Sequence, residues 1–189
     1  FTFGQLPEDA AGLTLVLSNG AEYEIDLSAG RAFTLPAALE DGTYTATAII
    51  TDIAGNTATS TLGFTVDTQL TVPVIELAQS SDSGMSAHDN VTRDTTPAFV
   101  LSNLDADVVK AEVLINGIAY PATKAGDSWH FTAPALVDGD YTVQVRVSDV
   151  AGNTADSAPL SVTIDTVTHE PVITLSDDSG VAGDNQTND

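Results

Sequence analysis

Acidic side chains in turns are the residues of this sequence with the most chemistry to offer. The octapeptide TDIAGNTA at 51–58 recurs almost unchanged as SDVAGNTA at 148–155, so an Asp and an Asn return at the same spacing. Carboxylate and amide oxygens are the ligands of hard cations such as Ca²⁺, which takes about six to eight of them. Asp, Asn and Gly are also the commonest turn formers. A single copy therefore leaves turn formation and cation binding equally open.

The two turns belong to a longer internal repeat. The stretch 39–58 matches 136–155 with an offset of 97 residues, as from Asp52 to Asp149. Further along, FTVDT at 64–68 matches VTIDT at 162–166 with an offset of 98. A period of this length suits a whole small domain. We predict one domain at 1–68 that lacks its first strand, a complete domain at 69–168, and the first strand and following loop of a third domain at 169–189. Because the chain opens in mid-pattern, we expect it to be a segment of a longer protein.

Alternation of apolar and polar residues predicts β-strands in each unit. Apolar residues occupy every second position from Tyr141 to Val147 and from Tyr44 to Ile50, which is the period of a strand with one face in a core. Further strands are predicted at 73–78, 97–102, 109–115, 128–133 and 159–165, and no helix of useful length is predicted. About seven short strands in about 95 residues predict an all-β fold, with immunoglobulin-like antiparallel β-sandwiches in a linear tandem array.

Aromatic residues support this fold class. Tyr44 and Tyr141 each follow an Asp-Gly pair by two residues, at the start of the most strongly alternating strand. In immunoglobulin-like sandwiches a Tyr at this place turns its hydroxyl back onto the preceding corner. We predict such a tyrosine corner in both units, and we expect Trp129 and Phe131 to fill the centre of the complete sandwich.

The motifs together resemble a known family. The combination DGxYTVxVxVxDxAGNTA, VTIDTxxxxPVITL and DSG…GDNxTND resembles the tandem bacterial Ig-like domains of giant type I-secreted adhesins, such as the SiiE and BapA types, over nearly the whole chain. The resemblance implies a stalk that carries a distant adhesive tip and is stiffened by Ca²⁺ at domain junctions. It also implies secretion to the bacterial cell surface, a host-cell or biofilm receptor reached through the tip, and a part in virulence or biofilm formation.

An Ig-like arrangement brings several acids to one end of the complete domain. The turn at 149–153 joins the last two strands, LDAD at 104–107 joins the second and third, and the preceding domain ends in VDT at 66–68. Bare carboxylates gathered there would repel one another, and Ca²⁺ accepts irregular loop oxygens where Mg²⁺ does not. The predicted ligands of this junction site are Asp67, Asp105, Asp107, Asp149, the carbonyl of Ala151, and Asn153.

Two further groups of acids extend the prediction. The first unit offers an incomplete equivalent of the junction site, without a preceding linker, in Asp52, Asn56, Glu8 and Asp9. The opposite end of the complete domain gathers a long loop, a corner and the end of the last strand, where either a metal ion or Arg93 would neutralise the charge. The candidates there are Asp82, Asp89, Asn90, Asp94, Asp138, Asp140 and Asp165.

Charge and composition exclude several partners. Five Lys and Arg against 27 Asp and Glu give a net charge of −22, which repels nucleic acid and anionic membrane surfaces. The chain has no Cys for disulfides or thiolate sites, and no apolar run of the ~20 residues that span a membrane. His88, His130 and His169 are scattered, so zinc is not expected. We expect a monomer whose partners are the neighbouring Ig-like domains of the same chain.

Three function classes compete. An enzyme is not expected, because no nucleophile–base pattern, phosphate loop or HExxH motif is present, and paired carboxylates in repeated loops do not suit the single cleft of a glycosidase. A binding module that contacts a host protein or glycan directly is the alternative, because Ig-like domains bind through loops and sheet faces. Aromatics are only 6% of the residues and stand mostly at core positions. A Ca²⁺-stiffened spacer is therefore the preferred interpretation.

Overall fold

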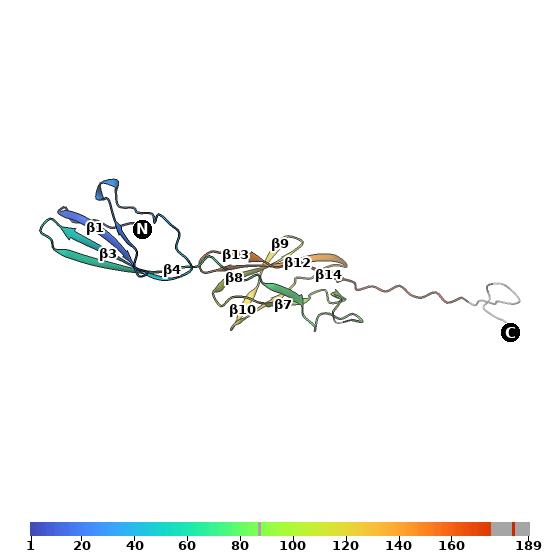
Figure 1. Ribbon diagram of the computed structural model, residues 1–189. Helices are drawn as coiled ribbons and strands as arrows, with labels where there is room; N and C mark the ends of the chain where they lie inside the picture. Colours follow the sequence, from blue (N-terminus) through green and yellow to red (C-terminus); the bar gives the residue numbers. More distant parts are fainter. Residues whose placement is uncertain (87, 175–182, 184–189) are drawn as a thin grey trace. The chain divides into compact units, whose positions relative to one another are not determined.

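The computed structural model describes residues 1–86, 88–174 and 183, and these form two compact units (Figure 1). The first unit comprises 1–72 together with two short segments, 104–110 and 147–155, each a loop with the adjoining strand residues. The second comprises the described parts of 73–103, 111–146 and 156–189.

The first unit is built on one antiparallel sheet. Its strands are β1 (Ala10–Leu17), β2 (Glu22–Glu24), β3 (Gly42–Asp52) and β4 (Thr57–Val66), in the order β2-β1-β3-β4. A single 3-10 turn, η1 (Leu27–Ala29), interrupts the connection between β2 and β3. It begins at Asp26, whose carboxylate accepts from Ser28 N at 2.9 Å. In the structure as described, this turn is the one helical segment, as the sequence predicted.

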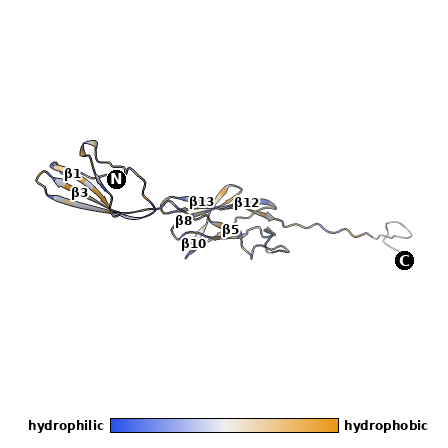
Figure 2. Cartoon of the chain, viewed as in Figure 1, coloured by the Kyte–Doolittle hydropathy of each residue, from blue (hydrophilic) through white to orange (hydrophobic). Residues whose placement is uncertain are grey.

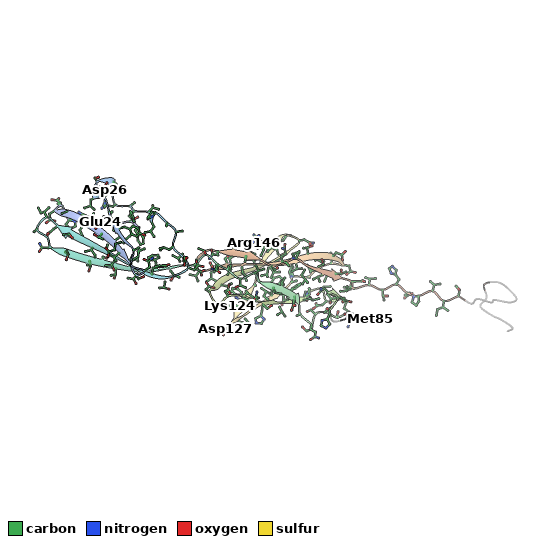
Figure 3. All side chains as sticks on the ribbon, viewed as in Figure 1. Glu24, Asp26, Met85, Lys124, Asp127 and Arg146 are labelled. Carbon is green, nitrogen blue, oxygen red and sulfur yellow. The ribbon has the colours of Figure 1, made fainter. Side chains whose placement is uncertain are left out.

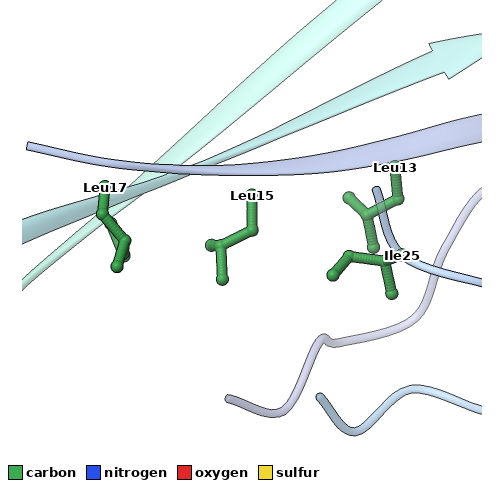
Figure 4. Close-up of a cluster of buried hydrophobic side chains, with 5 residues drawn as sticks. Leu13, Leu15, Leu17 and Ile25 are labelled. Atoms are coloured by element: carbon green, nitrogen blue, oxygen red, sulfur yellow. The ribbon is translucent and has the colours of Figure 1, made fainter. Parts of the chain in front are cut away.

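The core of the first unit lies on one face of this sheet. Leu13, Leu15 and Leu17 point to that face from alternate positions of β1, and Ile25 joins them (Figure 4). Aromatic residues from the irregular segments cover the cluster, and Phe1 and Tyr44 both pack on Phe64 at ring separations of 5.6 Å. Irregular segments thus cover part of the face that a second sheet covers in a complete sandwich.

The second unit contains a complete antiparallel β-sandwich. One sheet has the order β10-β11-β7-β5, and the other has the order β6-β14-β12-β8-β9 with β13 added to β12. The strands are β5 (Val74–Leu77), β6 (Val91–Thr92), β7 (Ala98–Ser102), β8 (Val108–Ile115), β9 (Ile118–Pro121), β10 (Thr123–Ala125), β11 (Ser128–Thr132), β12 (Gly139–Asp149), β13 (Thr154–Asp156) and β14 (Leu160–Ile164). The pairs β10–β11, β11–β7, β5–β7, β12–β14 and β8–β9 are antiparallel, and β6 pairs with β14 in parallel.

The inner faces of this sandwich carry the predicted alternation. Val143, Val145 and Val147 on β12 are fully buried, while the residues between them are more exposed. Trp129 and Phe131 are buried on β11, and the ring centre of Phe131 lies 6.2 Å from that of Tyr120 on β9, across the two sheets. β1 of the first unit alternates in the same way, and both hydrophobic and hydrophilic residues occur along the strands of the two units (Figure 2). The six strands whose ranges the sequence predicted in the second unit are all present, as β5, β7, β8, β11, β12 and β14, and β6, β9, β10 and β13 are additional short strands.

The tyrosine corner is confirmed in both units. The Tyr44 hydroxyl donates to the carbonyl of Glu40 at 3.0 Å, and the Tyr141 hydroxyl donates to the carbonyl of Val137 at 2.9 Å. Each bond spans four residues and fixes the corner that leads into the long strand β3 or β12. These two strands then end at Asp52 and Asp149, so the corner and the acidic turn lie at opposite ends of the same strand.

The predicted third domain falls mostly outside the described residues. Positions 175–182 and 184–189 are not described, and residues 165–174 carry no strand.

Candidate metal centre

The turn that follows β12 is held by the carboxylate of Asp149. Its Oδ1 accepts from the backbone N of Gly152 at 2.7 Å and of Asn153 at 2.8 Å, and its Oδ2 accepts from Asn153 Nδ2 at 2.7 Å. Gly152 takes a φ of 96°, in the region that favours glycine. Asp149 is only 3% exposed. Asp and Asn in this motif therefore form the turn themselves.

The turn that follows β3 repeats this hydrogen-bond pattern. Asp52 Oδ1 accepts from the backbone N of Asn56 at 2.8 Å, and Asp52 Oδ2 accepts from Asn56 Nδ2 at 2.8 Å. Gly55 takes a φ of 84°. Turn formation therefore explains why the letters D, G and N recur in both copies.

The second copy has contacts that the first lacks, and they come from the segment after β4. Asn153 Nδ2 also donates to the backbone carbonyl of Asp67 at 3.1 Å. Thr71 donates to the Asp105 carboxylate twice, from its backbone N at 2.6 Å and from Oγ1 at 2.7 Å. The segment 67–71 is thus bound to both loops, 104–110 and 147–155, that share the first unit with it.

Three carboxylates meet at this place. Asp67, Asp107 and Asp149 each offer an oxygen, and the three oxygens lie within 4.8 Å of one another. Two ligands on opposite sides of a Ca²⁺ ion stand up to about 5 Å apart, because each Ca–O distance is about 2.3–2.6 Å. The three oxygens therefore fit the coordination sphere of one such ion, and Asp149 Oδ2, which accepts one hydrogen bond in the turn, retains a lone pair for it.

Hydrogen bonds keep the acids around this place ionised. Burial raises the pKa of Asp149, but hydrogen bonds from Asn153, Gly152 and Ala151 outweigh it, and the pKa is lowered overall. Hydrogen bonds from Thr71 lower the pKa of Asp105, against burial and the negative charge of Asp149. Ionised carboxylates are the form that a cation requires.

Asp105 and the remaining predicted junction ligands take different positions. Both oxygens of Asp105 are engaged by Thr71, and Asp105 is outside the group of three. The Asn153 side chain contributes its NH₂ as a donor to Asp67 and Asp149. Ala151 is exposed in the turn. Ligation by Asp105, Ala151 or Asn153 stays a prediction.

The equivalent residues of the first turn do not form such a group. Asp9 meets the turn through its backbone, where its carbonyl accepts from Ile53 N at 3.1 Å. Within the described residues, Glu8, Asp9 and Asp52 are not brought together as three carboxylates.

The acids predicted at the other end of the complete domain are likewise spread over separate contacts. Asp138 accepts from Thr166 Oγ1 at 2.8 Å, and Asp140 accepts from Thr163 Oγ1 at 2.6 Å. Asp165 Oδ1 accepts from Val167 N at 3.2 Å. In the described parts of the chain, no three of the acids predicted there share one place by the same distance criterion. In the loop between β5 and β7, Asp89 Oδ1 accepts from Val91 N at 3.2 Å and Asp94 Oδ1 from Thr96 N at 2.9 Å, while Asp82 Oδ2 has a long contact of 3.4 Å from Asn90 N. Ligation by these four residues stays a prediction.

Sequence reasoning missed two polar contacts that position these loops. Thr71 binds Asp105, and Asp41 binds Thr68 through both its backbone N and Oγ1. The second of these has a counterpart in the bond between Asp138 and Thr166. The sequence did contain a signal for these contacts. Each long hairpin is preceded by an Asp-Gly pair, at 41–42 or 138–139, and followed by an Asp-Thr pair, at 67–68 or 165–166.

Comparison with known protein families identifies the family of the chain. The family model described as bacterial Ig-like domain matches residues 1–68 and 69–166. The chain therefore belongs to the bacterial Ig-like domain family, as two tandem copies. Domains of this kind are typically non-enzymatic. No curated protein matches the chain significantly in sequence.

Several solved structures are similar in fold. The fibronectin(III)-like modules of Clostridium thermocellum CbhA share 14% identity, with a TM-score of 0.49 over 91% of this chain and 88% of that one. A tetra-tandem repeat in the extending region of a large adhesion protein shares 19% identity, with a TM-score of 0.41 over 85% of this chain and 43% of that one. Murine CEACAM1b shares 14% identity, with a TM-score of 0.46 over 86% and 88%. In the residues described, no helix is long and apolar enough to cross a membrane.

Proposed function

We propose that this chain is a spacer segment of a large bacterial surface adhesin, of the secreted kind that its sequence resembles, and that Ca²⁺ stiffens the connection between its Ig-like domains. The two tandem copies of a bacterial Ig-like domain support the spacer part of the proposal. The receptor-binding part of such a protein would lie elsewhere, in a tip domain.

The observation that carries the proposal is the meeting of Asp67, Asp107 and Asp149. The three residues come from the segment after β4, the loop before β8 and the end of β12, and their carboxylate oxygens lie within 4.8 Å of one another. Three negative charges this close repel strongly unless a cation lies among them. A hard divalent cation with oxygen ligands is the neutraliser that fits, because the chain has no Cys and no cluster of His for zinc.

The cation would act by joining parts of the chain that are otherwise connected by a short linker. Asp67 belongs to the first matched domain, whereas Asp107 and Asp149 belong to the second. An ion held by all three removes rotational freedom at the connection, and without the ion the same charges push it open. At a hundredfold excess over Kd, one such ion stabilises the bound arrangement by about 2.7 kcal/mol. Extracellular sites with a Kd of about 10⁻⁴ to 10⁻³ M are half-filled or better at millimolar Ca²⁺.

The test is small-angle X-ray scattering on the whole chain with Ca²⁺ and with a chelator. Ca²⁺ should lengthen the particle and narrow its distribution of maximum dimensions. Asp107→Asn should remove most of this response, because it deletes one ligand charge and none of the hydrogen bonds of the turn at 149–153. Asp52→Asn is the matched control, since it alters the same turn in the copy without the carboxylate group, and it should leave the response intact. An identical particle in Ca²⁺ and in chelator would contradict the proposal.

A further inference from the structure

The segment 1–4 of the first unit has one backbone edge without a partner. On one side it runs antiparallel to 31–33, where Phe3 N donates to a backbone carbonyl at 2.8 Å. Successive residues of an extended chain direct their backbone groups to opposite edges, so those of Thr2 face the other side. In the described residues, neither Thr2 nor Gly4 makes a backbone hydrogen bond there. This edge is therefore open to a further strand.

An apolar groove of about 330 Å³ follows the open edge. It is bordered by the segment 1–7 and by the inner face of the sheet, where Ala48, Ile50 and Leu62 line it. Leu62 lies two residues before Phe64, which packs on the core, and is still 57% exposed. The first unit thus leaves apolar surface uncovered beside an unpaired backbone edge.

The second unit shows which element fills the equivalent place. The bridge between Thr2 and Ala32 has its counterpart, 98 residues later, in the pair of Val100 on β7 and His130 on β11. β7 therefore corresponds to the segment 1–4. The other edge of β7 carries β5, which pairs with it antiparallel. A strand like β5 is accordingly what fits the open edge of the first unit.

Burial shows the effect of this strand. Phe99 and Leu101 on β7 are 3% and 7% exposed, whereas their counterparts Phe1 and Phe3 are only half-buried. The sequence supplies large apolar side chains at both places, so the difference comes from the cover that β5 gives to β7. A strand added beside Phe1 and Phe3 would bury more apolar surface, which favours binding.

The chain contains a second segment with the sequence of β5. The letters EPVITL at 170–175 match VPVIEL at 72–77 with an offset of 98. In its described residues this segment carries no strand, and Val172 and Ile173 are 88% and 91% exposed along an extended stretch of chain (Figure 3). Ile75, the counterpart of Ile173, is 5% exposed within β5. The segment therefore has the side chains of β5 without its partner.

We propose that the groove of the first unit binds the segment 170–174 of a second copy of this chain, which adds to the open edge as an antiparallel strand. The register of β5 on β7 places Ile173 opposite Phe3. Strand addition of this kind takes its affinity from backbone hydrogen bonds and its specificity from side chains in pockets. The groove and the segment are different surfaces, so the contact is head-to-tail and extends into rows of copies. This departs from the monomer that the sequence led us to expect.

Charge gives the contact a characteristic salt dependence. The side chains that line the groove are uncharged, whereas each copy carries a net charge of −22. Copies therefore repel one another, and salt screens this repulsion without weakening the apolar contact. Association should accordingly become stronger as the ionic strength rises.

The test is sedimentation of the whole chain in chelator, over roughly 10 µM to 1 mM. The average mass should rise with concentration, past that of a dimer. Ile173→Asp should lower the association constant by about 10-fold or more, because it places a charge in an apolar groove. Val167→Asp is the matched control, since Val167 is exposed in the same stretch of chain, and it should associate as the wild type does.

A mixing experiment tests the head-to-tail geometry. Leu62→Glu puts a charge into the groove and keeps the segment, whereas Ile173→Asp keeps the groove and spoils the segment. Each variant alone should stay monomeric, and an equimolar mixture should form a one-to-one complex and nothing larger. A symmetric contact, in which both copies use the same surface, cannot give this rescue. Chelator makes the result independent of Ca²⁺, so it is separate from the test of the spacer.

Three results would overturn the inference. One is a wild-type chain that stays monomeric up to about 1 mM, as it would if the groove accepted only a strand from another protein. The second is undiminished association in a folded Ile173→Asp. The third is a mixture of the two variants that remains monomeric.

Discussion

The turn at 52–56 and the turn at 149–153 share the hydrogen bonds between their Asp and Asn and differ in their surroundings. In each, an Asp carboxylate accepts from the backbone N and the side-chain Nδ2 of the Asn four residues later. Around the second turn alone, Asn153 also binds the carbonyl of Asp67, and Asp67 and Asp107 bring their carboxylates to Asp149.

The difference separates two roles of the same motif. The turn is a local structure that each copy forms by itself, which is why the sequence repeats its letters. A cation site needs in addition a preceding linker and a neighbouring loop. Burial follows the same division, because Asp149 is buried while Asp52 is half-buried and Asn56 is exposed.

The largest expected effect is the loss of stability on removing the buried Asp. Asp149→Ala removes a buried carboxylate that accepts from Gly152 and Asn153, whereas Asp52 is half-buried and water replaces it at the first turn. We expect Asp149→Ala to lower the Tm by roughly 8 °C or more, and Asp52→Ala by about half as much. Fluorescence of Trp129, the single Trp of the chain, follows the second domain, and calorimetry follows both. Equal shifts for the two variants would remove the distinction between the turns.

The next effect is a difference in Tm between Asp107→Asn and the wild type, and we expect this difference to change sign when Ca²⁺ is added. Asp107→Asn relieves repulsion from Asp67 and Asp149, so in chelator the variant should melt at the same temperature as the wild type or higher. In Ca²⁺ it should melt lower than the wild type, because it has lost one ligand charge. Thermal melts monitored at Trp129 in both buffers test this. A variant that is less stable to the same extent in both buffers would show that Asp107 has a purely structural role.

A smaller effect concerns the two Asn side chains. Asn153→Ala removes the bond to Asp67 as well as the bond to Asp149, whereas Asn56→Ala removes only the bond to Asp52. In chelator, Asn153→Ala should therefore lower the Tm more, by roughly 4–8 °C against at most a few degrees for Asn56→Ala. Hydrogen exchange at Thr68 and Gln69 should also rise in the first variant and stay unchanged in the second.

The smallest effect is a pH dependence specific to the linker beside the second turn. The hydrogen bonds from Thr71 lower the pKa of Asp105, and the bond from the Thr71 side chain has the larger effect. A lowered folded pKa stabilises the fold above the unfolded pKa of about 3.9, and this contribution is lost as the pH falls through the folded value. Thr71→Val removes one of the two bonds, so the pKa of Asp105 should rise and stability should fall less between pH 5 and pH 2 in the variant. A carboxyl NMR titration measures the pKa, and no rise in Thr71→Val would contradict the assignment.

Most of the fold could be predicted because it is written in local patterns. The alternation from Tyr141 to Val147 placed β12 and its buried face, and the Asp-Gly-x-Tyr pattern placed the tyrosine corner. Short strands such as β6 and β13 could not be predicted, because two or three residues carry no period and pair only through the assembled sheet. The first unit also differs from the second in the way irregular segments around Phe1 and Phe33 cover its sheet, which depends on packing.

The sequence predicted which loops form the site, but it did not predict the contacts of every residue in them. Placing the loops on an Ig-like sandwich put Asp67, Asp107 and Asp149 at one end of the domain, and the structure brings these three together. The sequence could not show that Thr71 donates two hydrogen bonds to the Asp105 carboxylate, because a Thr in a linker has no recognisable pattern. Ligation at the predicted second site stays a prediction. The sequence did not show that Asp138 and Asp140 accept from Thr side chains at the end of β14 and beyond it, because these contacts appear only once the strands pair.

The most direct measurement is a crystal structure of the whole chain grown with Ca²⁺ in excess, with the ion located by anomalous scattering. The account predicts an anomalous peak within about 2.3–2.6 Å of carboxylate oxygens of Asp67, Asp107 and Asp149 together, and no such peak beside Asp52. Only water, or no density, among the three carboxylates at saturating Ca²⁺ would contradict it.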